Sequence, residues 1–183
     1  MTPAAERVVV GLGGNAFAAP HKPLTMAGQF QFARESLAQL GPLLDPATQL
    51  VAVHDAVRPF IDTAMVEAVI AEAGLHGAAI VGIVPVDTVK QVHKNRIRAT
   101  LSREHLVLAQ TPQVFRFDLL QRAFAKARED SFTGTDEASL VERLDEVAVH
   151  VVQGSDRNIK ITKPSDMDLA RLYLSQETSE QSA

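Results

Sequence analysis

Polar residues that can bind phosphate stand directly beside three apolar runs of the sequence. Residues 51–60 read VAVHDAVRPF, residues 111–115 read TPQVF, and residues 158–162 read NIKIT. An aspartate at a strand end can hold a divalent cation or a sugar hydroxyl, and an arginine can clamp a phosphate through two parallel hydrogen bonds. One hypothesis is a binding site shared between strands, and the other is ordinary turn chemistry.

Each of these side chains has a second interpretation. Asp55 and Arg58 can form a turn stabilised by their own ion pair, and His54 is expected to be structural rather than a catalytic base. Thr111 precedes a proline and is biased towards extended geometry, which leaves its hydroxyl for a ligand or for a local turn. Lys160 alternates with two isoleucines, so it faces either solvent or a cleft, where it would stabilise phosphate charge.

A second group of candidates lies within residues 87–110, where apolar and polar residues roughly alternate and Asn95 is available for a turn. This pattern predicts a protruding, half-exposed β-arm. Thr88 and Lys90 could contact a phosphate, although a lone lysine is more often found on a solvated arm. Three arginines follow, and they either keep an exposed edge from aggregating or reach into the anionic site of a neighbouring subunit: Arg96, Arg98 and Arg103.

The elements that would position these residues are predicted from hydrophobic patterning. Apolar runs predict strands over residues 7–12, 49–55, 77–86, 147–154 and 158–162. Periodicity near 3.6 predicts helices over residues 30–44, over 66–73 with Gly74 at the end, over 117–130, after a cap at Thr135, and from Pro164 onward. The extended segment formed by the apolar run before Thr111 is expected to end at Thr111-Pro112.

Apolar strands that alternate with helices indicate an α/β fold whose mostly parallel sheet is covered on both faces. In such sheets, ligands bind beyond the carboxyl ends of the strands. Four of the candidates fall at or near such ends: Asp55, Arg58, Thr88 and Lys160. The glycines at 11, 13 and 14 are a weak phosphate-loop signal, because the spacing that ends in Lys-Ser/Thr is absent.

Size and composition limit the possible classes. A chain of 183 residues fits one domain, 1–183, and the polar residues 175–183 are expected to fray. The net charge of -4 argues against a broad nucleic-acid surface. The sequence contains no cysteine, which excludes disulfides and thiolate chemistry. No apolar run of about 20 residues or signal-peptide pattern is present, so we expect no membrane association and a cytoplasmic location.

Five blocks of the sequence resemble the 2-C-methyl-D-erythritol 4-phosphate cytidylyltransferase family, in the family's order. The resemblance covers residues 47–174, and the blocks are VHDAVRPF at 53–60, VPVDTVK at 84–90, LAQTPQVF at 108–115, TDEASLVE at 135–142 and GSDRNIKITKPSDMDLA at 154–170. It implies a Rossmann-like nucleotidyltransferase fold and a homodimer joined through the arm. It also implies a transferase of the non-mevalonate isoprenoid pathway, which joins CTP and methylerythritol phosphate with Mg²⁺ as cofactor and releases pyrophosphate.

The resemblance also implies roles for individual residues. Six would contact the sugar phosphate: Asp55, Arg58, Thr88, Arg103, Thr111 and Thr135. Arg103 would come from the partner subunit, Lys160 would stabilise the pentacoordinate transition state, and Asp55 would lie close to the metal. Ser36 would contact the nucleotide, although Ala33 stands where the family has an arginine.

The start of the sequence departs from the family pattern. The family opens with a strand and a Gly-rich loop that wraps the CTP phosphates, whereas residues 6–14 resemble its second strand. On this alignment the opening strand and loop are missing, which puts the activity of this chain in question. Two alternatives to the cytidylyltransferase therefore stay open. One is a non-catalytic sugar-phosphate-binding and dimerisation module, and the other is a nucleotidyltransferase for a related polyol phosphate.

Overall fold

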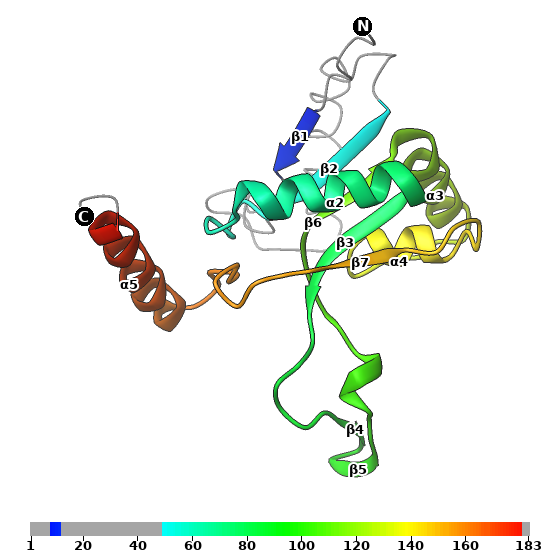
Figure 1. The fold of residues 1–183 in the computed structure, drawn as a ribbon. Coiled ribbons are helices and arrows are strands. Elements are labelled where there is room, and N and C mark those ends of the chain that lie inside the picture. The colour runs from blue at the N-terminus through cyan, green and yellow to red at the C-terminus, as the bar shows by residue number, and fades with distance from the viewer. Residues whose placement is uncertain (1–7, 12–48, 181–183) are drawn as a thin grey trace, which may run out of the picture.

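The computed structural model describes residues 8–11 and 49–180, with side chains from 49 to 176, and it forms an α/β fold (Figure 1). A five-stranded sheet has the order β1 (Val8–Gly11), β2 (Leu50–His54), β6 (Leu108–Arg116), β3 (Ala78–Ile83) and β7 (His150–Gln153). β1 pairs with β2, and β3 with β7, in parallel, whereas β6 runs antiparallel between β2 and β3. The predicted α/β class is confirmed. The sheet is mixed, because β6 is antiparallel to both of its neighbours whereas the other pairs are parallel.

β6 corrects the expectation that the chain breaks at Thr111-Pro112. The strand continues through this pair, whose peptide bond is cis. A proline inside a sheet normally removes a ladder hydrogen bond. Here the register of β6 against β3 shifts between Ile80 and Gly82, and the pairing of β2 with β6 ends at Val53 and Gln113. Pro112 therefore lies where the ladder is already interrupted, and the strand tolerates it.

Helices cover both faces of the sheet. α2 (Thr63–His76) packs on one face through Met65, Val69, Ile70 and Ala73. α3 (Phe117–Glu129) and α4 (Glu137–Glu142) pack on the other face, around Phe115. α2 ends three residues later than predicted, because Gly77, not Gly74, adopts the left-handed conformation at φ 92° and donates its backbone N–H to the Ala73 carbonyl.

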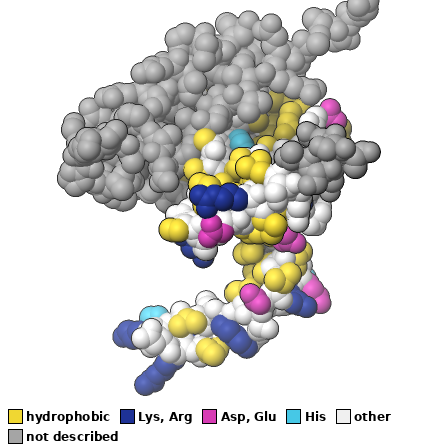
Figure 2. Space-filling model, turned by 90° about the vertical axis from the view of Figure 1, so that its left-hand side faces the viewer, with side chains coloured by type: hydrophobic (Ala, Val, Ile, Leu, Met, Phe, Trp, Pro, Cys, Tyr) yellow, Lys and Arg dark blue, Asp and Glu magenta, His cyan; other side chains and the backbone are white. Residues whose placement is uncertain are grey.

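The arm is confirmed as a hairpin, with corrected limits. β4 (Lys90–His93) and β5 (Arg96–Thr100) pair through a tight turn whose two residues, Lys94 and Asn95, both have positive φ. A short 3₁₀ turn, η3 (Arg103–His105), follows. Residues 108–110, predicted to belong to the arm, are instead the start of β6, where Leu108 and Ala109 pair with β3. The hairpin projects away from the sheet and carries several Lys and Arg side chains (Figures 1 and 2).

The C-terminal segment contradicts the prediction of a strand over residues 158–162. Residues 158–162 form no strand; they connect β7 to α5 (Pro164–Glu180) and are tied to the body by the Ile161 N–H, which donates to the Val57 carbonyl. Residues 175–180 form the end of α5, residues 181–183 lie outside the described residues, and fraying of this end stays a prediction. No helix in the described part of the chain is both long and apolar enough to cross a membrane.

Candidate functional site

A network of charged side chains lies beyond the end of β2. Asp55 Oδ2 accepts a hydrogen bond from Arg58 Nε at 3.1 Å and lies 3.0 Å from Lys160 Nζ. The Asp55 and Arg58 side chains are only 16% and 11% exposed, whereas that of Lys160 is 43% exposed. One largely buried carboxylate thus holds two cations, and one of these cations reaches solvent.

Arg58 has a structural role in this network. Its backbone N–H donates to the Asp55 carbonyl at 2.9 Å, which closes the turn after β2. Its guanidinium Nη1 donates to the Asn158 carbonyl at 2.7 Å and so joins this turn to the segment that carries Lys160. The interpretation as a turn stabilised by its own arginine is therefore correct for this pair. It does not exclude a ligand, because the interactions place two cations at one edge of the sheet.

Thr111 and His54 form a second layer beneath Asp55. The Thr111 hydroxyl oxygen accepts the Asp55 backbone N–H at 2.9 Å and lies 2.9 Å from His54 Nδ1. His54 Nε2 lies 3.0 Å from the Arg58 carbonyl, which can only accept, so Nε2 carries the proton. In the neutral ring Nδ1 then accepts the Thr111 hydroxyl proton. The Thr111 hydroxyl and both ring nitrogens of His54 are thus engaged in contacts within the protein.

Asn158 anchors the loop that presents Lys160. Its side chain is fully buried, and Nδ2 donates to the Thr111 carbonyl at 2.9 Å and to Gln110 Oε1 at 3.3 Å. Gln110 Nε2 in turn donates to the Ser155 carbonyl at 3.0 Å. These bonds replace the sheet pairing that residues 158–162 lack. The position of Lys160 is therefore fixed by a buried amide and not by a strand.

The start of α4 contributes a further anionic group. The helix is capped by Asp136, whose Oδ1 accepts from the Ser139 N–H, and not by Thr135 as predicted. Buried Gln113 on β6 holds this cap, because it donates to Asp136 Oδ2 and accepts from the Ala138 N–H. Burial raises the pKa of the Glu137 carboxyl. The charges of Asp136 and Asp55 raise this pKa further, and Lys160 opposes them. Glu137 therefore shares the electrostatic environment of Asp55.

Comparison with known proteins identifies the family of this chain. A sequence profile for 2-C-methyl-D-erythritol 4-phosphate cytidylyltransferase matches residues 34–176, well over half of the chain. The chain belongs to this family. A cytidylyltransferase of this name from Solibacter usitatus is 62% identical over 150 residues, which are 80% of this chain and 61% of that protein. The protein from Acidobacterium capsulatum is 54% identical over 73% of this chain and 57% of its own length. The chain thus spans about three fifths of the length of these curated relatives.

Solved structures of cytidylyltransferases share the fold. The Thermus thermophilus 2-C-methyl-D-erythritol 4-phosphate cytidylyltransferase superposes with a TM-score of 0.71 at 30% identity, over 92% of this chain and 82% of that one. The 4-diphosphocytidyl-2C-methyl-D-erythritol synthase of Anaerococcus prevotii gives 0.70 at 33% identity, over 76% of this chain and 64% of that one. The predicted nucleotidyltransferase fold is therefore confirmed.

The structure brings four of the predicted cytidylyltransferase residues together and leaves the others apart. Asp55, Arg58, Thr111 and Lys160 form one connected network. Among the described residues, no hydrogen bond or ion pair joins this network to three other candidates: Thr88, Arg103 and Thr135. Thr88 and Thr135 are exposed, and Arg103 on the arm donates to the Val86 carbonyl. Ser36 lies outside the described residues. The ligand roles of all eight remain predictions.

Sequence reasoning missed the buried polar residues around the Asp55 network. Gln110, Gln113 and Asn158 are buried and bridge β6, α4 and the Lys160 loop. Glu137 was not among the predicted site residues. A signal for them does exist: a glutamine or asparagine inside an otherwise apolar run is buried, and buried amides need partners. What the sequence does not indicate is which backbone groups those partners are.

Proposed function

We propose that this chain catalyses the reaction named for its family, the transfer of CMP from CTP to 2-C-methyl-D-erythritol 4-phosphate. A phosphate oxygen of the sugar attacks the α-phosphorus of CTP and forms a new P–O bond. The bond between the α-phosphorus and the bridging oxygen to the β-phosphate breaks, and pyrophosphate leaves with that oxygen. The product carries a diphosphate between cytidine and the sugar alcohol, in non-mevalonate isoprenoid synthesis.

The observation that carries the proposal is the convergence of Arg58 and Lys160 on Asp55. Reaction between two anions requires cations at fixed positions, because charge on the phosphate oxygens must be stabilised in the transition state. Lys160 is held by Asp55 at 3.0 Å while its side chain remains 43% exposed. An incoming phosphate can therefore compete with Asp55 for the ammonium group. Arg58, pinned by Asp55 and the Asn158 carbonyl, provides a positive charge that does not have to reorganise.

The residues present fit the Mg²⁺ ion that the family implies, in a limited role. Asp55 Oδ2 is taken by two cations, but Oδ1 accepts no hydrogen bond from any described residue. Asp55 belongs to none of the three-residue His/Asp/Glu groups with metal-ligand spacing among the described residues. A single carboxylate suffices because Mg²⁺ usually keeps several waters and takes substrate phosphates as ligands. Bound there, the ion would neutralise charge on the CTP phosphates, and Asp55 Oδ1 would be its protein ligand.

We also propose that the chain acts as a cytoplasmic homodimer joined through the arm. The arm carries two large apolar side chains that are more than half exposed, Val92 and Ile97, and exposed Val86 directly precedes it. It also carries exposed cations at Lys90, Arg96, Arg98 and Arg103. Such a mixed surface suits burial against a second subunit, where Arg103 would reach the partner's sugar phosphate together with Thr88, Thr111 and Thr135. The cytoplasmic location is part of this proposal and rests on the proposed use of CTP.

Pyrophosphate release with CTP, Mg²⁺ and the sugar phosphate tests the reaction. We expect the chain to release pyrophosphate, and Lys160→Met to lower kcat by on the order of 10²–10³-fold, as for loss of one stabilising donor. Lys163→Met is the matched control, because it removes an exposed lysine three positions along the same segment. Its kcat should stay within about twofold, as for a surface substitution away from the site.

Other outcomes would separate the alternatives. No pyrophosphate from a chain with native circular dichroism would reject catalysis. Calorimetry would then decide whether the chain is a binding module, which would give heat with the sugar phosphate and none with CTP. Faster pyrophosphate release with another polyol phosphate would assign a different acceptor. Equal activity of the Lys160 and Lys163 variants would remove Lys160 from the mechanism.

A further inference from the structure

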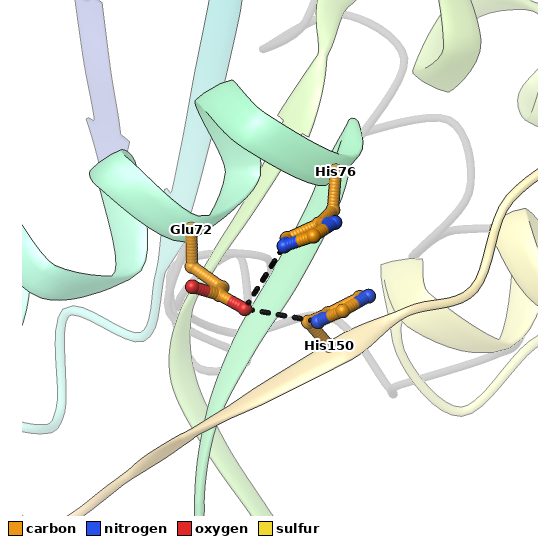
Figure 3. Close-up of side chains that lie close together, drawn as sticks. All are labelled: Glu72, His76 and His150. Atoms are coloured by element: carbon orange, nitrogen blue, oxygen red, sulfur yellow. Dashed lines mark hydrogen bonds and ion pairs between the residues drawn. The ribbon is translucent and has the colours of Figure 1, made fainter.

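Two histidines and a glutamate come together at the end of α2 and the start of β7. Glu72 and His76 are four residues apart on α2 and therefore lie on the same side of the helix. His150 is the first residue of β7. Glu72 Oε1 lies 3.4 Å from His76 Nε2 and 2.9 Å from His150 Nδ1 (Figure 3). Both imidazole rings thus direct one nitrogen to the same oxygen atom.

The spacing of these three atoms matches the coordination sphere of a small divalent ion. All three ligand atoms lie within 4.8 Å of one another. A tetrahedral ion with bonds of about 2.0–2.1 Å places its ligands roughly 3.3 Å apart, close to the two distances to Glu72. The rings are stacked, with centroids 3.7 Å apart and planes 6° from parallel. Imidazole lone pairs lie in the ring planes, so these parallel rings must rotate out of their stack before both nitrogens can bind one ion, and their partial exposure leaves room for this rotation.

The chemistry of the three ligands selects the class of ion. Imidazole nitrogen combined with one carboxylate suits Zn²⁺, Co²⁺, Ni²⁺ or Cu²⁺, whereas Mg²⁺ and Ca²⁺ prefer oxygen ligands. The three side chains are 33–42% exposed, so an ion can enter without unfolding. Three protein ligands leave a fourth position for water. The site is therefore suited to exchangeable binding rather than to a permanently closed structural centre.

The cluster lies away from the Asp55 network. His150 pairs in register with Ala79, near the start of β3, whereas Asp55 follows the end of β2. Since β2 is antiparallel to β6 and β6 is antiparallel to β3, β2 and β3 point the same way. The cluster is consequently at the amino end of the strands, and the Asp55 network is at the carboxyl end. An ion at the cluster would bridge α2 to β7 without contacting the proposed substrates.

We propose that Glu72, His76 and His150 form a binding site for a divalent transition-metal ion of the zinc class, which clamps the end of α2 to β7. The ion replaces the hydrogen bond between His150 and Glu72 and the ion-pair contact between His76 and Glu72. Bridging the helix and the strand, it stabilises the folded chain in proportion to its occupancy. The proposal does not depend on the cytidylyltransferase reaction.

A zinc titration against a colorimetric chelator tests the proposal. The full chain, stripped with chelator and dialysed, should bind one Zn²⁺ with an affinity that excess Mg²⁺ does not reduce. His76→Ala and His150→Ala should each weaken binding by at least about 10–100-fold, the range seen when even an outer-shell partner is lost. Glu72→Gln keeps the side-chain shape and should weaken binding too. His105→Ala, on the exposed arm, is the control and should bind as the wild type does.

A second readout separates metal binding from folding defects. Zn²⁺ should raise the thermal unfolding midpoint of the wild type and of His105→Ala, but not that of the three cluster variants. Co²⁺ should give visible absorption of tetrahedral intensity that His76→Ala abolishes. Zinc binding that is absent in the wild type, or unchanged in all three cluster variants, would overturn the site. Because the clustered side chains are partly exposed, we expect their variants to fold, and matching circular dichroism verifies this.

Discussion

The Asn158→Asp substitution tests whether a buried amide holds the Lys160 loop in place. The change is nearly isosteric, so it creates no cavity, and it replaces the donor Nδ2 by an acceptor. In the wild type, Nδ2 faces two acceptor oxygens, the Thr111 carbonyl at 2.9 Å and Gln110 Oε1 at 3.3 Å. The orientation of this amide follows from its partners, since a flipped amide would direct Oδ1 at both oxygens. Oδ1 itself is buried without a hydrogen-bond partner.

The size of the effect follows from these contacts. Loss of two neutral hydrogen bonds costs about 2 kcal/mol at roughly 1 kcal/mol each. An ionised carboxylate at a fully buried position adds the cost of an unpaired charge, so we expect a total loss of about 3–5 kcal/mol in the free energy of unfolding at pH 7.5. Once protonated, the new carboxyl can donate to the Thr111 carbonyl and recover one of the two bonds.

The loss should therefore depend on pH in a defined direction. Burial and the two facing oxygens raise the pKa of the new carboxyl above its value of about 4 in the unfolded chain. Below that value the folded and unfolded states both carry the proton, and the ionic penalty is absent. The penalty grows as the pH rises towards the folded-state pKa. We expect the loss of unfolding free energy at pH 5 to be smaller than at pH 7.5 by at least about 1 kcal/mol.

Urea unfolding followed by circular dichroism at the two pH values measures both quantities. The matched control is Gln121→Glu, the same amide-to-acid change at an exposed position of α3, which should stay within about 0.5 kcal/mol of the wild type. A loss for Asn158→Asp no larger than for the control would refute the anchoring role. An equal loss at both pH values would refute the account based on a buried charge.

Three further changes test other parts of the structure. Gln113→Leu should lower the unfolding free energy by about 1–3 kcal/mol, measured in urea, because the Ala138 N–H loses its buried acceptor; a loss under about 0.5 kcal/mol would contradict this. For Glu137→Gln, the free energy of unfolding relative to that of the wild type should rise as the pH increases from 4 to 7. Burial raises the pKa of Glu137, so its ionisation opposes folding in the wild type and not in the variant. A difference in urea midpoints that stays constant with pH would count against this. Lys94→Asn should increase hydrogen-exchange protection of the hairpin up to about fivefold, since asparagine tolerates positive φ; unchanged exchange would refute this.

The sequence predicts the helices and inner strands well because their signals are local. The apolar face of α2 and the runs that become β2 and β3 are legible from residue spacing alone. The errors occur where tertiary contacts override local preference. Pro112 is a strand breaker in isolation but lies at a register shift in β6. Residues 158–162 alternate like a strand, yet Asn158 draws them into a loop held by side-chain bonds.

The grouping of the site residues follows from the direction of β6. An antiparallel strand brings its amino-terminal half to the edge where its parallel neighbours end. Gln110 and Thr111 therefore lie beside Asp55, which follows β2, and beside the loop after β7. A fully parallel sheet would have placed Thr111 at the opposite edge. The predicted grouping of Thr111 with Asp55 thus agrees with the structure, although β6 continues through Thr111-Pro112 where the extended segment was predicted to end.

The side chains of this site are positioned by single hydrogen bonds rather than by ladders. Lys160 lies outside regular structure, and its loop is fixed by the Asn158 amide, the Arg58 guanidinium and one backbone bond to Val57. Such loops open more easily than a paired strand, because few bonds must break. In the proposed reaction Lys160 leaves Asp55 to follow a phosphate and requires this freedom, whereas Arg58 is buried and held by Asp55 and the Asn158 carbonyl. The site therefore combines one fixed cation with one adjustable cation, an arrangement suited to binding an anion whose charge shifts during reaction.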